Sequence, residues 1–175
     1  VARVRALMAK AGLYALLVPR ADEHQGEYVP PSAERLAWLT GFTGSAGLAI
    51  LTRRQGALLV DGRYTVQARR QIDAGVFELP AIARMRLGEW LTQSMAKGGV
   101  VGFDPWLHTA AEIARLSGEL SPKGLKLKPT PRNLVDRAWG NERPAPPLGP
   151  VVVQPIERAG RSAADKIADV FKPYR

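Results

Sequence analysis

Apolar residues near the start of the chain first follow the spacing of a helix and then close up into an unbroken run. The helical stripe consists of Val4, Leu7, Met8 and Ala11. Residues three and four apart share one face of a helix, and Gly12 stands where a glycine commonly ends one. The apolar run 13–18 is typical of a buried strand, and Pro19 is expected to stop it. A helix leading into a buried strand predicts an α/β fold.

The stretch 38–64 predicts the centre of the sheet. Two apolar runs, 48–51 and 57–60, flank a polar connection that contains Gly56, which is typical of a β-hairpin. Glycines at positions 41, 44 and 47 precede the hairpin. They match neither a dinucleotide nor a phosphate-binding signature, because a strand follows them and no Gly-Lys-Ser/Thr is present. We interpret them as supplying backbone conformations that a Cβ forbids. Close approach of a peptide or a neighbouring domain is the alternative.

Helices and strands continue to alternate along the rest of the chain. Ser32 is placed to cap a short helix carrying Leu36 and Leu39. Asp61 is placed to cap a helix whose inner face carries Tyr64, Ala68 and Ile72. Further strands are expected at 77–80, 100–103 and, as a half-exposed edge, 125–128. Further helices are expected at 87–95, 109–120, with a capping box at its start, and 132–139. The sequence predicts one α/β domain over residues 1–140, with a mixed β-sheet flanked by helices.

The composition changes after the predicted domain. Seven prolines fall in the 27 residues 129–155, which favours a stiff, extended strap. Ser162 then caps a final helix that carries Ile167, Val170 and Phe171 on one face, and Pro173 is expected to end it. Because a lone amphipathic helix needs a surface to pack on, we expect residues 141–175 to be a strap and the first helix of a truncated second domain.

Charge and composition narrow the classes of function. The 175 residues include no cysteine, so neither disulfides nor thiolate metal sites are expected, and with no apolar run of eighteen residues and no signal-peptide pattern we expect a cytoplasmic, non-membrane protein. The net charge of +9 favours acidic partners. The densest basic stretch, 123–137, carries no interleaved aromatic residues, which makes nucleic acid the minor interpretation. A stand-alone basic module that binds nucleic acid or an acidic protein partner is therefore the alternative function.

The polar loop 19–31 follows the first strand. Its potential metal ligands are Asp22, Glu23, His24 and Glu27. Their spacing matches no recognised ligand pattern, so we interpret the loop as solvated and anchored by Tyr28 and Val29.

Arg63 lies just beyond a buried strand, where open α/β sheets tend to place groups that face ligands. It has no nearby partner in the sequence if Asp61 is occupied by helix amides. The N–H donors of its planar guanidinium suit a carboxylate or a peptide carbonyl. A single arginine more commonly forms a surface or structural ion pair.

Several separated motifs resemble, in order and spacing, the N-terminal domain of Xaa-Pro aminopeptidases, or aminopeptidase P, in the creatinase and prolidase superfamily. They are DEHQGEYVP at 22–30, GFTGSAG at 41–47, VDGRY at 60–64 and NLVDRAW at 133–139. The later ERAGRS at 157–162 resembles the entry to that family's second domain. The resemblance covers almost the whole chain, points to the long, three-domain form of the enzyme, and implies a ribonuclease-H-like arrangement of the sheet.

This resemblance also implies which domain of the parent enzyme carries out catalysis. The family hydrolyses the bond between an N-terminal residue and a following proline, with two divalent metal ions, usually manganese, in a C-terminal domain. The resemblance implies no catalytic residue and no metal ligand in this chain, which is expected to be inactive alone. It implies that Arg63 contacts the peptide substrate, with His24 and Tyr28 as second candidates, and that the domain covers the cleft and helps a homo-oligomer assemble. The ending 171–175 departs from the family's long helix.

Overall fold

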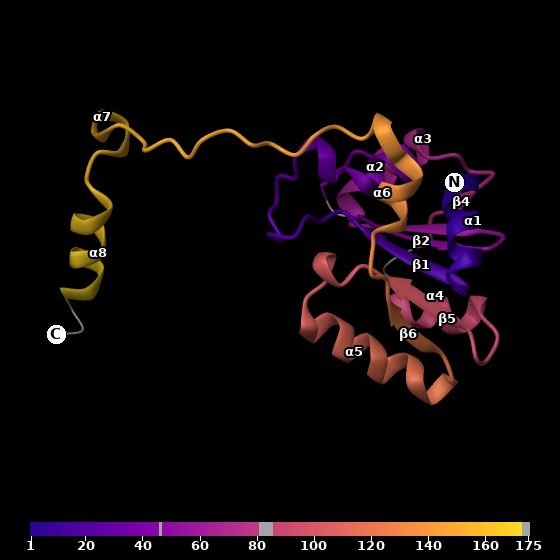
Figure 1. Ribbon diagram of the computed structural model, residues 1–175. Coiled ribbons are helices and arrows are strands. Elements are labelled where there is room, and N and C mark those ends of the chain that lie inside the picture. Colours follow the sequence, from indigo (N-terminus) through magenta and orange to yellow (C-terminus); the bar gives the residue numbers. More distant parts are fainter. Residues whose placement is uncertain (46, 81–85, 173–175) are drawn as a thin grey trace.

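A mixed, six-stranded sheet organises the computed structural model, which describes residues 1–45, 47–80 and 86–172 (Figure 1). The strands are β1 (Ala15–Pro19), β2 (Gly47–Thr52), β3 (Gly56–Val60), β4 (Phe77–Glu78), β5 (Val100–Phe103) and β6 (Lys126–Pro129). Their order across the sheet is β4-β3-β2-β1-β5-β6. Among these six strands, β2 alone runs against its neighbours, since it pairs antiparallel with β1 and β3 while the other pairs are parallel. The predicted fold class and the hairpin are confirmed.

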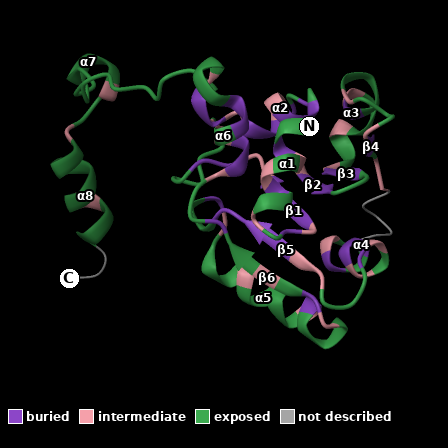
Figure 2. Cartoon of the chain, turned by 45° about the vertical axis from the view of Figure 1, so that its right-hand side comes forward, coloured by how far each residue is buried: buried purple, intermediate pink, exposed green. Residues whose placement is uncertain are grey.

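Helices cover both faces of this sheet. They are α1 (Ala2–Lys10), α2 (Arg35–Thr40), α3 (Thr65–Gln71), α4 (Leu87–Ser94), α5 (Ala110–Leu120) and α6 (Leu134–Trp139). Buried residues of α1, α2, α3 and α6 form one hydrophobic core, and those of α4 and α5 form the other. Figure 2 shows buried residues concentrated between these layers.

The two cores explain why the central strands read as unbroken apolar runs. In β1, Leu16 and Val18 face the first core, while Ala15 and Leu17 face the second. Successive side chains of a strand point to opposite faces, so a strand covered on both sides needs apolar residues at every position. Strand β6 differs, because Leu127 packs against the second core while the residues on either side of it are exposed lysines. Its predicted role as a half-exposed edge is confirmed.

Two predicted helix caps are present, and two differ from the prediction. The side chains of Thr109 and Ser162 accept the expected hydrogen bonds from backbone N–H groups. Asp61 accepts the N–H of Arg63 but caps the 3-10 turn Gly62–Tyr64, and α3 begins only at Thr65. Ser32 caps nothing, because it lies within a 3-10 turn, Pro31–Ala33, and α2 begins only at Arg35. Pro19 is the last residue of β1, where it pairs with Leu48 at the strand end, rather than the residue after it. Pro173, which was expected to end the final helix, lies outside the described residues.

Within the described residues, the start of the tail is bonded to the domain through Arg143. Arg143 donates from Nε to the backbone oxygen of Ser32 at 2.7 Å and from Nη1 to Asp136 at 3.1 Å. Beyond it, Leu148 and Val151–Val153 are exposed, as are most residues of the short helices α7 (Ile156–Ala159) and α8 (Ala163–Phe171). Figure 1 shows the strap leading away from the sheet to these helices. The division of the chain into two domains near residue 140 stays a prediction.

No helix in the described part of the chain combines the length and the hydropathy that crossing a membrane would require.

Candidate functional site

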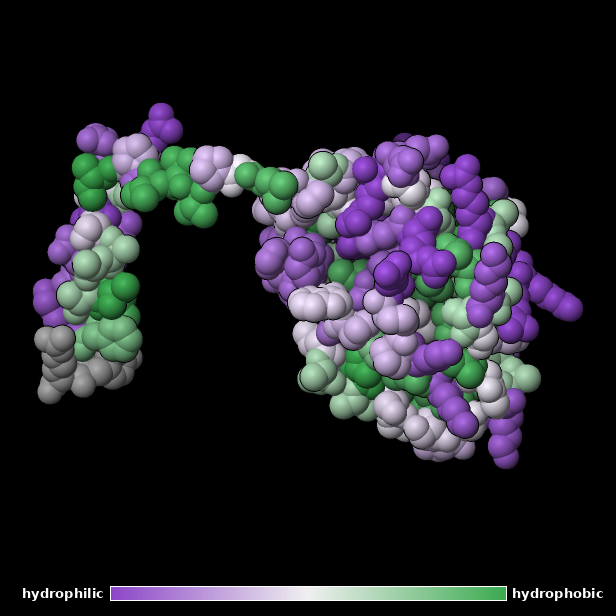
Figure 3. Space-filling model, viewed as in Figure 1, coloured by the Kyte–Doolittle hydropathy of each residue, from purple (hydrophilic) through white to green (hydrophobic). Residues whose placement is uncertain are grey.

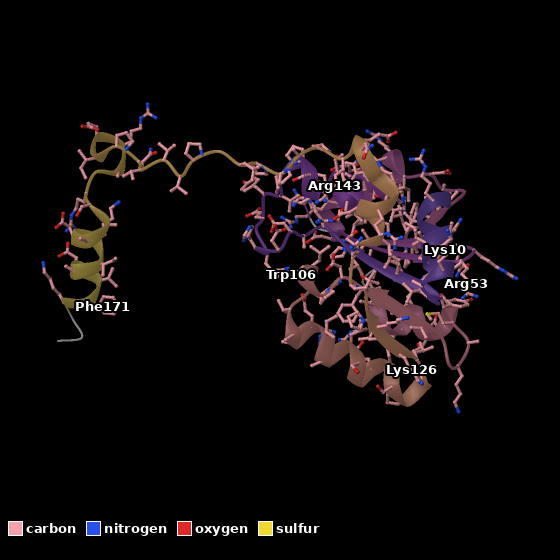
Figure 4. The ribbon with its side chains drawn as sticks, in the orientation of Figure 1. Lys10, Arg53, Trp106, Lys126, Arg143 and Phe171 are labelled. Carbon is pink, nitrogen blue, oxygen red and sulfur yellow. The ribbon has the colours of Figure 1, made fainter. Side chains whose placement is uncertain are left out.

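The ends of several parallel strands bring the predicted site residues to one edge of the sheet. Strands β1, β3 and β5 point the same way, so the loops after Pro19, Val60 and Phe103 emerge together. This edge is where open α/β sheets commonly bind ligands. Figure 4 shows Trp106, which follows β5, at this edge, with Arg53 and Lys126 toward the opposite side of the domain.

Arg63 is held at this edge by Asp61. The Asp61 carboxylate accepts the backbone N–H of Arg63 at 2.9 Å, its Nε at 3.0 Å and its Nη2 at 3.2 Å. The guanidinium also lies 5.5 Å from the centre of the Tyr64 ring. The expectation that Arg63 lacks a nearby partner is therefore wrong. One carboxylate offers enough lone pairs to cap the turn and to bind a guanidinium at the same time.

The electrostatics of this pair keep both groups charged. A hydrogen bond from the Arg63 side chain, with help from its backbone N–H, holds the pKa of Asp61 below its usual value. The same bond to Asp61 is the main cause of the raised pKa of Arg63, to which the carboxylate of Glu27 adds a smaller contribution. The Arg63 side chain is 73% exposed, so the pair itself contributes little stability. Its Nη1 group makes no hydrogen bond to any described residue and can donate to a ligand oxygen.

Tyr64 connects Arg63 to the loop that carries Gly41 and Gly44, here called the glycine loop. Its hydroxyl is hydrogen-bonded to the Ser45 hydroxyl, and its ring meets the edge of Phe42 with 6.0 Å between ring centres. A Cβ on Gly44 would lie 2.2 Å from Cζ of Phe42 and 2.8 Å from Cδ1 of Tyr64. Gly41 has a φ of +81°, the left-handed conformation that the sequence interpretation expected of these glycines. The requirement at Gly44 is different, because there the side chains of the site leave no room for a Cβ.

Arg20 ties the polar loop 19–31 to the glycine loop, and the sequence did not predict this role. Its Nη1 donates to the backbone oxygen of Glu27 at 2.7 Å and to that of Ser45 at 3.5 Å, while its Nη2 lies 3.5 Å from Glu34. The side chain is only 11% exposed. The one available signal was a basic residue placed between a strand end and an acidic loop, and no spacing rule identifies such a brace.

His24 and Tyr28 line a cavity of about 500 Å³ between their loop and the start of the strap, where Asp22 and Arg143 also contribute. Arg63 is absent from its lining, so the structure places the three predicted residues at one edge but not in one cavity. The loop is organised by Asp22, which is 5% exposed and accepts the N–H of His24 at 3.0 Å. Tyr28 is 87% exposed, so its predicted anchoring role is wrong.

The two histidines lie on separate loops and do not form a metal site. His108 follows β5, and its ring meets Phe103 edge-on with 5.9 Å between centres. Burial lowers its pKa, and its Nε2 is buried without a hydrogen-bond partner among the described residues. Within residues 1–45, 47–80 and 86–172, no three His, Cys, Asp or Glu residues gather closely enough to hold a metal ion. The residues described therefore do not fit a metal pair.

Known proteins resemble this chain both in the domain that contains the sheet and in the tail. Residues 1–137 match the family described as the creatinase/prolidase N-terminal domain. A probable Xaa-Pro aminopeptidase P from Pyrenophora teres f. teres is 40% identical, over 98% of this chain and 26% of its own length. One from Coccidioides posadasii is 42% identical, over 98% of this chain and 28% of its own length. The chain thus spans little more than a quarter of these curated relatives.

Two solved structures show how far the fold is shared. An X-prolyl aminopeptidase from Caenorhabditis elegans, described as a cytosolic enzyme with a di-nuclear active site, has a TM-score of 0.84 and 31% identity. The match covers 98% of this chain and 30% of that one. The N-terminal domain of the cytoplasmic peptidase PepQ from Mycobacterium tuberculosis has a TM-score of 0.58 and 25% identity, over 78% of this chain and 95% of its own. The C. elegans structure and the curated relatives therefore match the tail as well as the domain that contains the sheet.

Proposed function

Because this chain belongs to the creatinase/prolidase N-terminal domain family, we propose that it is the non-catalytic N-terminal domain of a metal-dependent Xaa-Pro aminopeptidase. Such an enzyme removes an N-terminal residue that precedes proline. The observation that carries the proposal is the extent of the match: two Xaa-Pro aminopeptidase P relatives align over 98% of the chain, whereas the family domain ends at residue 137. The strap and the last helices are therefore part of what is shared with these enzymes.

In this proposal catalysis resides in the part of the protein beyond the chain. Two divalent metal ions, manganese in the expected form of the enzyme, would be held there, because the described residues offer no suitable group of ligands. The description of the C. elegans relative as having a di-nuclear active site supports this division. The present domain covers the catalytic cleft and helps a homo-oligomer to assemble in the cytoplasm.

The tail supplies the connection between these parts. Its exposed apolar residues, among them Ile167, Val170 and Phe171 of α8, have no partner within the described chain. Figure 3 shows apolar side chains along the strap and on α8 in this view. Burying each such side chain stabilises a structure by about 1.5–3 kcal/mol. We therefore assign residues 141–175 to the start of a second domain against which α8 packs.

Arg63 is the proposed substrate contact. Its Nη1 group is free to donate to a peptide carbonyl or carboxylate beyond the scissile bond, while Asp61 fixes the orientation of the guanidinium. His24 and Tyr28, in the neighbouring cavity, are secondary candidates. In the full-length enzyme, Arg63→Ala should lower kcat/KM on short Xaa-Pro peptides about tenfold, the effect of losing one charge-assisted hydrogen bond. Arg69→Ala, on exposed α3, is the matched control, and equal activity of both variants would remove Arg63 from the site.

The proposed function is tested with the full-length protein loaded with manganese. It should release alanine from Ala-Pro-Pro and leave Ala-Ala-Pro intact, as followed by mass spectrometry of the products. The 175-residue chain alone should release nothing under the same conditions. Failure of the full-length protein to cleave the proline-containing peptide, or cleavage by the isolated chain at a comparable rate, would refute the proposal.

A further inference from the structure

A groove of about 380 Å³ lies beside the edge strand β6, away from the edge that carries Arg63. It forms because the helices do not cover all of the first sheet face. Leu125 and Leu127 pack against the second core, so Lys126 and Lys128 point to the opposite face, next to α1 and α6. The gap between this strand and the two helices remains open, and three cations line it: Lys128, Arg132 and Arg137.

The positive charge of this groove is not cancelled locally. No Asp or Glu is among the described residues that line it. Arg132 and Arg137 are exposed, and their side chains form no ion pair or hydrogen bond with any described residue. Among the described residues, Lys128 donates to the backbone oxygen of Ala11 at 2.9 Å, at the end of α1. The acidic residue of α6, Asp136, is already occupied by Arg35 and Arg143. The groove therefore attracts anions.

Its floor is apolar and fixed. Leu13 and Leu134 are buried, and Pro129 and Pro131 add two rigid rings. Leu13 packs so tightly on β5 that a Cβ added to Gly102 would lie 2.4 Å from Leu13 Cδ1. A volume of this size lies at the lower end of ordinary ligand pockets. Solvated surface cations need no such floor, whereas a ligand that carries both carboxylates and an apolar side chain would use both features.

We propose that this groove binds an acidic peptide segment. Its carboxylates would contact Lys128, Arg132 and Arg137, and an apolar side chain would lie over Leu13 and Leu134. This inference is independent of peptidase activity and gives the +9 charge a specific location.

Two features decide against other occupants. The described residues that line the groove include no aromatic ring on which nucleic-acid bases could stack. Strand addition is also limited, because the N–H groups of Lys126 and Thr130 donate toward β5 and Pro129 has none, which leaves Leu127 with an N–H that points outward. Recognition in this proposal therefore comes mainly from side chains.

The test uses the 175-residue chain labelled with nitrogen-15 and titrated with acetyl-Glu-Glu-Leu-Glu-Glu-amide, followed by NMR. The matched variants are Arg132→Gln/Arg137→Gln in the groove and Arg69→Gln/Arg70→Gln on exposed α3, which remove the same charge. Binding should change the chemical shifts of the backbone amides of Leu13, Thr130 and Leu134. Affinity should fall about tenfold in the groove variant and less than twofold in the control, as expected for two partly screened ion pairs.

Two further probes complete the test. The peptide with every Glu replaced by Gln should bind at least tenfold more weakly. Raising the salt concentration from about 50 to 300 mM should strongly weaken binding of the acidic peptide. Equal losses in both variant pairs would overturn the proposal, because they indicate attraction to net charge alone. Shifts that map elsewhere, or tighter binding of a single-stranded oligonucleotide in the same groove, would also overturn it.

Discussion

Removal of the Asp136 carboxylate should destabilise the domain more than most surface changes. Asp136, on α6, accepts Nε of Arg35 at 2.7 Å and Nη2 at 3.0 Å, and it also pairs with Arg143. The Arg35 side chain, on α2, is only 7% exposed, and its Nη1 already lacks a partner among the described residues. Asp136→Ala would therefore leave a buried guanidinium with no counter-charge.

The size of the effect follows from this geometry. Breaking a buried ion pair by deleting one partner costs about 3–5 kcal/mol, mostly because the remaining charge is desolvated and unpaired. The Asp136 side chain is 20% exposed, so water can reach the vacated position and the lower end, about 3 kcal/mol, is expected. At about 2–4 °C per kcal/mol for a chain of this size, the Tm should fall by about 6–12 °C.

Urea unfolding followed by far-UV circular dichroism measures this loss directly. Arg143→Ala removes the more exposed partner and should cost less than about 1 kcal/mol. Arg35→Met combined with Asp136→Leu should recover most of the stability, because no unpaired charge is then left inside. A loss below about 1 kcal/mol for Asp136→Ala would show that Arg35 is solvated in solution, and the reasoning from burial would be wrong.

Four further substitutions test other parts of the structure. Gly44→Ala should cost about 1–3 kcal/mol in the same unfolding assay, because its Cβ would overlap Phe42 and Tyr64, whereas Gly118→Ala, in open space on α5, should stabilise by about 0.5–1 kcal/mol. Because the pKa of His108 is lowered in the folded state, the unfolded chain protonates His108 at a higher pH than the folded chain does. The free energy of unfolding should therefore fall as pH drops from 6.5 through the folded pKa. His108→Gln should flatten that slope, and an unchanged pH profile of unfolding would contradict it. Thr109→Ala removes a capping-box hydroxyl and should cost about 1 kcal/mol, and no loss of thermal stability would contradict the cap.

At the site, sequence reasoning reached the position of Arg63 but not its surroundings. It placed Arg63 after a buried strand, and the structure agrees. It assigned Asp61 to the helix cap alone, because a spacing of two residues does not show that one carboxylate can serve both the amide and the guanidinium. It could not find Arg20, whose partners Glu27, Ser45 and Glu34 lie 7, 25 and 14 residues away. Such contacts depend on how loops from different strands meet.

The sequence by itself determined the local elements and their inner faces. Hydrophobic spacing fixes which side of a helix or strand avoids water, and this predicted the hairpin, the stripes of α4 and α5 and the exposed lysines of β6. Only the tertiary structure decided the order of the strands, the burial of Arg35 against Asp136 and the groove beside β6. Those features depend on which segments, far apart in the sequence, come into contact. The periodicity of hydrophobic residues does not specify these contacts.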